Sequence, residues 1–250
     1  MPRRMRPYLL QVSFRPGAQI DHEVYPFTIP AVRDLEKIRF HENVTFLVGE
    51  NGSGKSTVLE ALAISLGLGA EGGTRNTLFK TADAVSPLHE SLRLSRGTPK
   101  PRDAYFLRAE SFYNVATYMD EVDYLRSYGG KSLHKQSHGE SFMAVLLNKL
   151  RGDGIYFLDE PEAALSPTRQ LAALRAIHEL VEDSSQFIIA THSPILLSYP
   201  RSKIIQFDEF GIREIALKDT DHFAVTRDFL NNHEARLQEL LNDSADEQRA

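Results

Sequence analysis

The motif GENGSGKST combines glycines, a lysine and hydroxyl side chains in a spacing suited to binding a phosphate group. Gly49, Gly52 and Gly54 let a loop curl so that its backbone N–H groups point at an anion, and Lys55 adds a positive charge. Ser56 follows, and its hydroxyl can ligate Mg²⁺. The sequence therefore predicts phosphate contacts from Gly49, Glu50, Asn51, Gly52, Ser53, Gly54, Lys55, Ser56 and Thr57.

Two adjacent acids, Asp159 and Glu160, end the apolar stretch IYFL. If IYFL is a buried strand, Asp159 emerges at the carboxyl edge of the sheet and can share Mg²⁺ with Ser56. Glu160 is then placed to polarise an attacking water. In the alternative, both acids merely end a strand beside Pro161, and the phosphate loop in the same chain weighs against that interpretation.

Two further polar sites stand beside apolar runs. His192 follows FIIAT, where an imidazole can hydrogen-bond a γ-phosphate, although a lone histidine at a strand end is more often structural. Ser137 and Gly139 precede the apolar run FMAVLL, which predicts a helix beginning at this point. The unpaired N–H groups of a helix start can face an anion, and the plain alternative is an ordinary helix cap.

Buried strands alternate with helices along the chain, which predicts an α/β fold with a mainly parallel sheet. The predicted strands are residues 44–48, 104–107, 155–158, 187–190 and 203–207, and the clearest predicted helices are 57–69 and 166–183. In the second helix Ser166 caps the first turn, and the predicted buried stripe is Leu171, Leu174, Ile177, Leu180 and Val181. Residues 71–103 predict an irregular surface insert.

The length of 250 residues favours one domain over two small ones. We expect this domain to span 1–242, with a lobe at about 71–150 and a disordered tail at 243–250. The chain has no cysteine, which excludes disulfides and cysteine-ligated zinc, and no apolar run is long enough to span a membrane. We expect a cytoplasmic protein. The net charge of −5 argues against a uniformly basic nucleic-acid binder.

The order of phosphate loop, serine-glycine helix start, acidic strand end and histidine resembles the nucleotide-binding domain of the ABC ATPase superfamily. The resemblance implies a P-loop NTPase fold with a mainly parallel core sheet, an N-terminal antiparallel β portion and a small helical or irregular lobe. It also implies ATP and Mg²⁺ as ligands. Two copies would pair head to tail around two ATP molecules, with the serine-glycine helix start of one copy closing on the γ-phosphate held by the other.

The resemblance also assigns a role to each matching position. Lys55, Ser56 and Thr57 would bind phosphates and Mg²⁺, and Asp159 would be the Mg²⁺ carboxylate. Glu160 would be the catalytic base and His192 the switch histidine. Ser137, Gly139 and Glu140 would contact the partner's nucleotide. Ala164, Leu165 and Ser166 would communicate across the dimer. His138 and Glu140 depart from the family pattern, which has glycine and glutamine there. Glu110 is the nearest polar candidate for the family's sensor glutamine. Tyr25 lies at about the right distance upstream to stack on adenine, and a core or surface tyrosine is the alternative.

The sequence DEPEAALSPTRQ, followed by ATHSPILL, resembles the soluble ABC ATPases of the RecF, SMC and overcoming-lysogenization-defect type, but the chain lacks the long coiled-coil insertion of SMC proteins. This resemblance implies an ATPase whose ATP-driven homodimer gates a protein or nucleic-acid partner, as in repair or phage defence. Two alternatives stay open: the energising subunit of an ABC transporter, and a nucleotide-gated binding module with negligible turnover. A basic stripe for nucleic acid would comprise Arg75, Lys80, Arg93, Arg96, Lys100 and Arg102, and a solvated loop is an equal alternative.

Overall fold

The computed structural model describes residues 7–74, 86–110, 117 and 137–246. Within these residues, six strands form a central sheet in the order β5-β6-β7-β3-β8-β9. The strands are β3 (Val44–Val48), β5 (Asp103–Arg108), β6 (Gly154–Asp159), β7 (Gln186–Ala190), β8 (Ser202–Asp208) and β9 (Gly211–Ile215). The predicted mainly parallel sheet is confirmed, since every neighbouring pair is parallel except the hairpin of β8 and β9.

The three central strands β3, β6 and β7 are buried along their whole length. Layers on both faces of a parallel sheet exclude water from it, which explains the continuous apolar runs of these strands. Because the three strands run in the same direction, their carboxyl ends meet at one edge of the sheet. The phosphate loop and the acidic pair are therefore brought to the same edge, as the sequence predicts.

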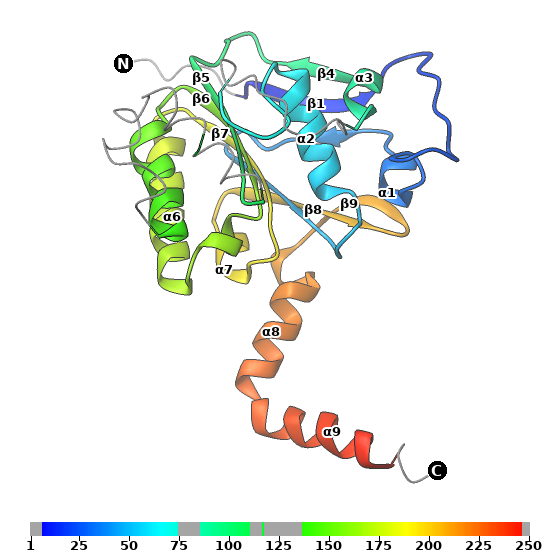
Figure 1. Cartoon of the computed structure of the whole chain (residues 1–250), viewed down its shortest axis with the longest axis vertical. Helices are drawn as coiled ribbons and strands as arrows, with labels where there is room; N and C mark the ends of the chain where they lie inside the picture. Colours follow the sequence, from blue (N-terminus) through cyan, green and yellow to red (C-terminus); the bar gives the residue numbers. More distant parts are fainter. Residues whose placement is uncertain (1–6, 75–85, 111–116, 118–136, 247–250) are drawn as a thin grey trace.

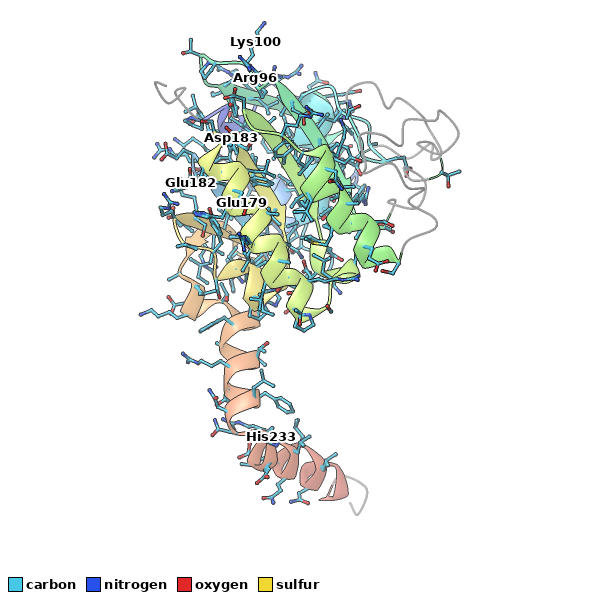
Figure 2. The ribbon with its side chains drawn as sticks, turned by 90° about the vertical axis from the view of Figure 1, so that its left-hand side faces the viewer. Arg96, Lys100, Glu179, Glu182, Asp183 and His233 are labelled. Carbon is cyan, nitrogen blue, oxygen red and sulfur yellow. The ribbon has the colours of Figure 1, made fainter. Side chains whose placement is uncertain are left out.

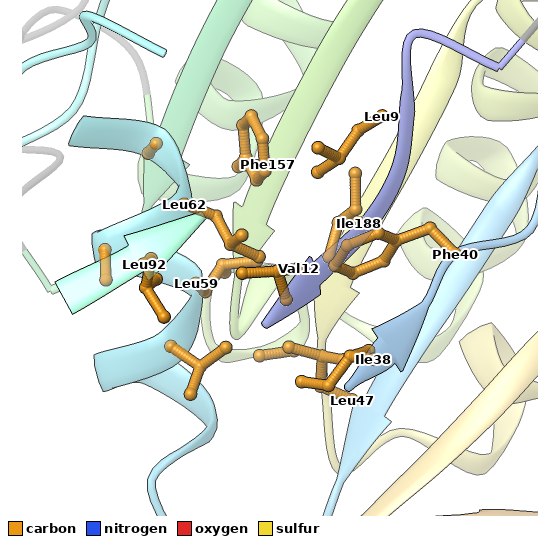
Figure 3. Close-up of a cluster of buried hydrophobic side chains, with 14 of the residues drawn as sticks. Leu9, Val12, Ile38, Phe40, Leu47, Leu59, Leu62, Leu92, Phe157 and Ile188 are labelled. Carbon is orange, nitrogen blue, oxygen red and sulfur yellow. The ribbon is translucent and has the colours of Figure 1, made fainter. Parts of the chain in front are cut away.

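One face of the central sheet packs against α2 and a smaller antiparallel sheet with the order β2-β1-β4 (Figure 1). The elements of this layer are β1 (Leu9–Phe14), α1 (Pro30–Arg33), β2 (Ile38–Arg39), α2 (Lys55–Ser65), α3 (Leu88–Ser91) and β4 (Leu92–Arg96). Figure 3 shows side chains such as Val12, Leu59 and Phe157 meeting between the layers. This sheet is the N-terminal antiparallel portion that the resemblance implies.

The opposite face packs against a helical layer. Its elements are α5 (His138–Ala144), the π-helical turn Val145–Lys149, the 3₁₀ turn Pro161–Ala164, α6 (Pro167–Glu182) and α7 (Pro194–Leu197). Ser166 caps α6 as predicted, because its side chain accepts a hydrogen bond from the backbone N–H of Arg169. Successive residues of each strand point to opposite faces, so Phe46 joins this core while its neighbour Leu47 joins the other.

Two details of the predicted elements are wrong. Leu171, placed in the buried stripe of α6, is 59% exposed, because Gln170, Ala173 and Ile177 form the buried side of that helix. The segment 71–103 is not wholly irregular either: Leu92–Arg96 pairs with β1 as strand β4. The buried side of α6 includes short side chains such as Ala173, and strand β4 contains two arginines, so neither feature shows a hydrophobic periodicity in the sequence.

The C-terminal helices α8 (Asp221–Asn231) and α9 (His233–Asp246) extend away from the layered body as an arm (Figure 1). No residue of α8 is buried. The predicted tail at 243–250 begins inside α9. Much of the predicted lobe at 71–150 falls outside the described residues. The domain division therefore stays a prediction. In the part of the chain that the structure describes, no helix is both long and apolar enough to cross a membrane.

Candidate functional site

The phosphate loop joins the end of β3 to the start of α2, in the strand–loop–helix order that the motif requires. Two of its glycines have no room for a side chain. A Cβ at Gly49 would lie 2.2 Å from the carbonyl oxygen of Phe207, and one at Gly54 would lie 2.9 Å from Cγ2 of Val32. Both residues also have positive φ angles, 146° and 98°. The loop conformation therefore depends on glycine at these positions.

Lys55 lies inside this loop and is only 4% exposed. Its ammonium donates hydrogen bonds to the carbonyl oxygens of Gly49 at 2.7 Å and Glu50 at 2.9 Å. Burial lowers the pKa of Lys55, and the nearby carboxylates of Glu160 and Asp159 oppose that shift. The loop thus holds a desolvated cation against two of its own carbonyl oxygens.

A buried hydroxyl also lies in the loop. The Oγ atom of Ser53 has no hydrogen-bond partner among the described residues, although it is shielded from water. A buried polar atom without a partner is costly, and a phosphate oxygen would accept its hydrogen. The loop residues therefore fit a nucleotide phosphate.

Ser56 connects the loop to the acidic strand end. Its hydroxyl donates a hydrogen bond of 2.9 Å to Oδ1 of Asp159, across a separation of 103 residues. Asp159 is the last residue of β6 and is 4% exposed. Burial raises the pKa of this carboxyl to about 6, against the lowering effects of the Ser56 hydrogen bond and Arg108. Two oxygen donors thus face one position, as a magnesium site needs.

Arg108 is a site residue that the sequence analysis missed. It is the last residue of β5, paired in register with Asp159, and its guanidinium lies 2.8 Å from Glu60 and 3.5 Å from Asp159. Glu110, the nearest candidate for the sensor position, is 82% exposed and pairs with Arg108 at 3.3 Å. Arg108 therefore lies between Glu110 and the acidic strand end, and its place directly after the apolar run AYFL was the available signal.

Glu160 and His192 face each other at the same edge. Nε2 of His192 lies 3.7 Å from Oε1 of Glu160 and, among the described residues, is buried without a hydrogen-bond partner. Burial, followed by the charge of Lys55, lowers the pKa of His192, so its imidazole is neutral at pH 7. Glu160 itself has a positive φ of 49°, which turns the backbone sharply after the strand.

Glu162 is the second residue that sequence reasoning missed. Its carboxylate accepts hydrogen bonds from the backbone N–H of His192 and, at 2.6 Å, from the hydroxyl of Thr191. Burial raises the pKa of Glu162, and these two donors oppose that shift. Glu162 therefore ties the segment after β6 to the segment after β7, and holds His192 by its backbone.

Ser137, Gly139 and Glu140 gather at the start of α5, on the helical layer. Ser137 and Glu140 form a reciprocal cap, and Arg169 donates to Ser137 Oγ at 3.2 Å and to Glu140 Oε1 at 3.4 Å. A Cβ at Gly139 would lie 2.4 Å from this guanidinium. Among the described residues, these side chains bond to one another and to α6, and not to the phosphate loop of the same chain.

Tyr25 lies beside the phosphate loop, with its hydroxyl 3.1 Å from Oγ1 of Thr57. The two residues border a hollow of about 300 Å³ whose lining is Tyr25, Ile29, Asn51, Gly52, Gly54, Lys55, Ser56, Thr57 and Glu160. The ring of Tyr25 is 57% exposed. Its predicted stacking on adenine stays a prediction.

The basic residues of the 71–103 segment are only partly described. Arg93 and Arg96 line a hollow of about 820 Å³ together with Arg15 and one acid, Glu90. Figure 2 shows Arg96 and Lys100 at the end of the molecule opposite His233 of the arm. Arg75 and Lys80 lie outside the described residues, so nucleic-acid binding by this stripe stays a prediction.

Two family models match separate parts of the chain that contain these motifs. An AAA domain model matches residues 26–93, which include the phosphate loop. A second model, described as "AAA domain, putative AbiEii toxin, Type IV TA system", matches residues 139–198, which include the acidic pair and the histidine. Both segments that carry the motifs therefore match AAA domain models.

Solved structures with similar chains include MJ1267, an ATP-binding cassette of an ABC transporter, in its ADP conformation. This chain is 15% identical to it, over 83% of this chain and 90% of that one, with a TM-score of 0.47. The SMC head domain from Thermotoga maritima is also 15% identical, over 83% of this chain and 98% of that one, with a TM-score of 0.44. No curated protein matches the chain.

Proposed function

We propose that this ABC/AAA-type domain binds ATP with Mg²⁺ and hydrolyses it in a head-to-tail homodimer that gates a protein or nucleic-acid partner. The observation that carries the proposal is the hydrogen bond between Ser56 and Asp159. It joins the phosphate loop to the acidic strand end, so that Lys55, Glu160 and His192 surround one position.

The chain's own residues supply the parts of an in-line attack of water on the γ-phosphate. Lys55 neutralises charge on the phosphate oxygens, and Glu160 holds the attacking water and accepts its proton. His192, neutral and without a hydrogen-bond partner at Nε2 among the described residues, can donate to or accept from the reacting group. Pre-placed groups of this kind lower the barrier because they need no rearrangement during the reaction.

The hydroxyl of Ser56 and the carboxylate of Asp159 would hold Mg²⁺, with phosphate oxygens and water completing its ligands. Bound there, the cation supplies positive charge beside the β- and γ-phosphates. Asp159 must be ionised to ligate it, and its buried carboxyl is ionised above a pKa of about 6.

The start of α5 supports the dimer part of the proposal. Ser137 and Glu140 are exposed on the helical layer and, among the described residues, do not reach the phosphate loop of their own chain. In a head-to-tail pair, Ser137 and Gly139 would face the γ-phosphate held by the partner. ATP would then stabilise the dimer by binding at the interface.

The variant Glu160→Gln tests the reaction. It keeps the shape of the side chain and removes the base, so we expect phosphate release from Mg²⁺-ATP to fall by about 100-fold or more while ATP binding persists. Glu179→Gln, an exposed acid on α6, is the matched control and should keep wild-type turnover. Equal turnover in wild type and Glu160→Gln would instead favour the nucleotide-gated binding module.

The mass of Glu160→Gln in solution tests the dimer. Light scattering after size exclusion should show a monomer without nucleotide and a dimer with Mg²⁺-ATP. Adding Ser137→Arg, which places a bulky cation at the start of α5, should abolish the shift. A mass that is the same with and without Mg²⁺-ATP would rule out the ATP-dependent homodimer. In a separate experiment, recovery of the protein with membranes when its genomic neighbours are co-expressed would favour the transporter alternative.

A further inference from the structure

A second histidine, His222, lies against His192 and has no role in the sequence motifs. The two imidazole rings are 4.7 Å apart between centroids and cross at 78°, an edge-to-face arrangement. Aromatic rings favour this geometry because the positive edge of one meets the negative face of the other. His222 comes from α8, the first helix of the arm, so the contact joins the arm to the segment that follows β7.

The position of His222 is fixed by the start of its helix. Thr220 is fully buried and caps α8: its hydroxyl accepts from the backbone N–H of Phe223 and donates to the carbonyl oxygen of Leu217 at 2.7 Å. His222 also borders a hollow of about 490 Å³ whose lining includes Gly49, Glu50, Asn51, Gly52 and Ser53 of the phosphate loop. The residue therefore lies between the switch histidine and the loop.

The orientation of the His192 ring depends on packing more than on hydrogen bonds. Its backbone N–H is held by Glu162, but within the described residues Nε2 has no hydrogen-bond partner and Glu160 is 3.7 Å away. The ring contact that the described residues supply is the one with His222. Removing that ring would leave the imidazole of His192 free to turn about its side-chain bonds.

We propose that His222 is a positioning residue that holds the imidazole of His192 toward Glu160 and the γ-phosphate. The inference rests on the proposed ATPase function, because it assigns His222 a part in the same reaction. It also attaches the start of the α8–α9 arm to the reacting end of the nucleotide. A ring at position 222 is what the role needs, so phenylalanine should replace histidine there.

Steady-state kinetics of the full-length chain test the role. His222→Ala should lower kcat by about 3- to 10-fold, the loss expected when one edge-to-face contact is removed, with KM for ATP changed by less than about 2-fold. His222→Phe should restore kcat to within about 2-fold of wild type. His233→Ala is the matched control: it removes an exposed histidine further along the arm and should change neither constant (Figure 2). Thermal melting must show that each variant is folded, and His222→Leu replaces the alanine variant if that one melts early.

A nuclear magnetic resonance measurement separates this inference from the proposed function. The imidazole signals of His192, assigned with His192→Gln, should shift or broaden in His222→Ala, return toward wild type in His222→Phe and stay unchanged in His233→Ala. Unchanged His192 signals in His222→Ala would overturn the positioning role whatever the turnover. If wild type and Glu160→Gln hydrolyse ATP equally, the proposed function fails, and these signals alone decide whether His222 orients His192.

The kinetic outcomes are equally decisive when turnover depends on Glu160. A kcat for His222→Ala equal to wild type means that the orientation of His192 does not need His222. A folded His222→Phe as slow as His222→Ala means that an imidazole nitrogen is required, so the residue acts chemically and the positioning role is wrong. Loss of ATP affinity with unchanged kcat assigns His222 to nucleotide binding instead.

Discussion

The phosphate-loop side and the α5 side of the molecule differ in how their polar residues are held. Lys55 and Asp159 are each 4% exposed: Asp159 ends the fully buried strand β6, and Lys55 begins α2 after the loop that follows the fully buried strand β3. Glu140 and Arg169, at the start of α5, have side chains that are 55% and 38% exposed. The core fixes the first group, whereas exposed hydrogen bonds and ion pairs hold the second, and such pairs contribute little to stability.

This difference indicates a division of labour in the proposed site. The phosphate-loop side is formed before nucleotide arrives, and its buried charges lower the stability of the fold. The exposed polar residues on the α5 side have little effect on the stability of the fold. Under the proposed function, they contact a nucleotide only when a second copy of the chain supplies it. Substitutions on the two sides should therefore separate binding, assembly and stability.

The largest expected effect is that of Lys55→Ala on the phosphate-loop side. Removing the buried ammonium deletes charge-assisted hydrogen bonds to phosphate, so ATP affinity should fall by about 100-fold or more in isothermal titration calorimetry. Lys37→Ala, at an exposed lysine, is the matched control and should bind as wild type. Binding that survives Lys55→Ala would show that the loop is not the nucleotide site.

An intermediate effect is expected from Arg169→Ala on the α5 side. The change removes the hydrogen bonds to Ser137 and Glu140 and leaves the Glu140 carboxylate held by the backbone N–H of Ser137. In the Glu160→Gln background, ATP-dependent dimerisation should weaken by about 3- to 10-fold, while the free energy of unfolding changes by less than about 0.5 kcal/mol. Arg175→Ala, an exposed arginine on the same helix, should leave both unchanged. A large loss of stability would contradict the contrast between the two sides.

On the phosphate-loop side, a gain of stability rather than a loss of binding is expected in Asp159→Asn. Folding raises the pKa of this carboxyl from its ordinary 3.8 to about 6, so the folded state loses stability as pH rises from about 4 to about 6. Asparagine carries no charge, and without Mg²⁺ the variant should be about 1–3 kcal/mol more stable at pH 7.5. Denaturant unfolding in EDTA should show this gain at pH 7.5 and none at pH 4. Asp219→Asn, at an exposed acid, should show no gain at either pH.

Much of the body of the fold is predictable from the sequence because its strands are buried on both faces. Runs such as VTFLV and IYFL have one interpretation when glycine or acidic residues end them, and all five predicted strands are present. The failures lie where burial is partial. Leu171 is apolar but lies on the exposed side of α6, since small residues such as Ala173 make the helix contact. Strand β4 carries two arginines and pairs only at the small sheet.

The candidate site divides in the same way. Residues at or just after the ends of buried strands, such as Asp159 and His192, are predictable from the sequence because the sheet geometry places them. Arg108, Glu162 and His222 were missed because each acts through contacts between distant segments, which spacing does not reveal. A charged or aromatic residue adjacent to a motif carries no periodic signal of its own.

The backbone strain at Glu160 has a consequence for how the gene would change over evolution. Its backbone adopts a left-handed conformation, with φ 49° and ψ 52°, that glycine or asparagine adopts more easily than glutamate. Replacing Glu160 by glycine or asparagine would relieve about 1 kcal/mol of backbone strain and so stabilise a copy that is no longer selected for turnover. Copies of this gene that are still selected for a stable fold but no longer for turnover should therefore lose the glutamate early, so that glycine or asparagine after the strand marks a descendant that has stopped hydrolysing its nucleotide.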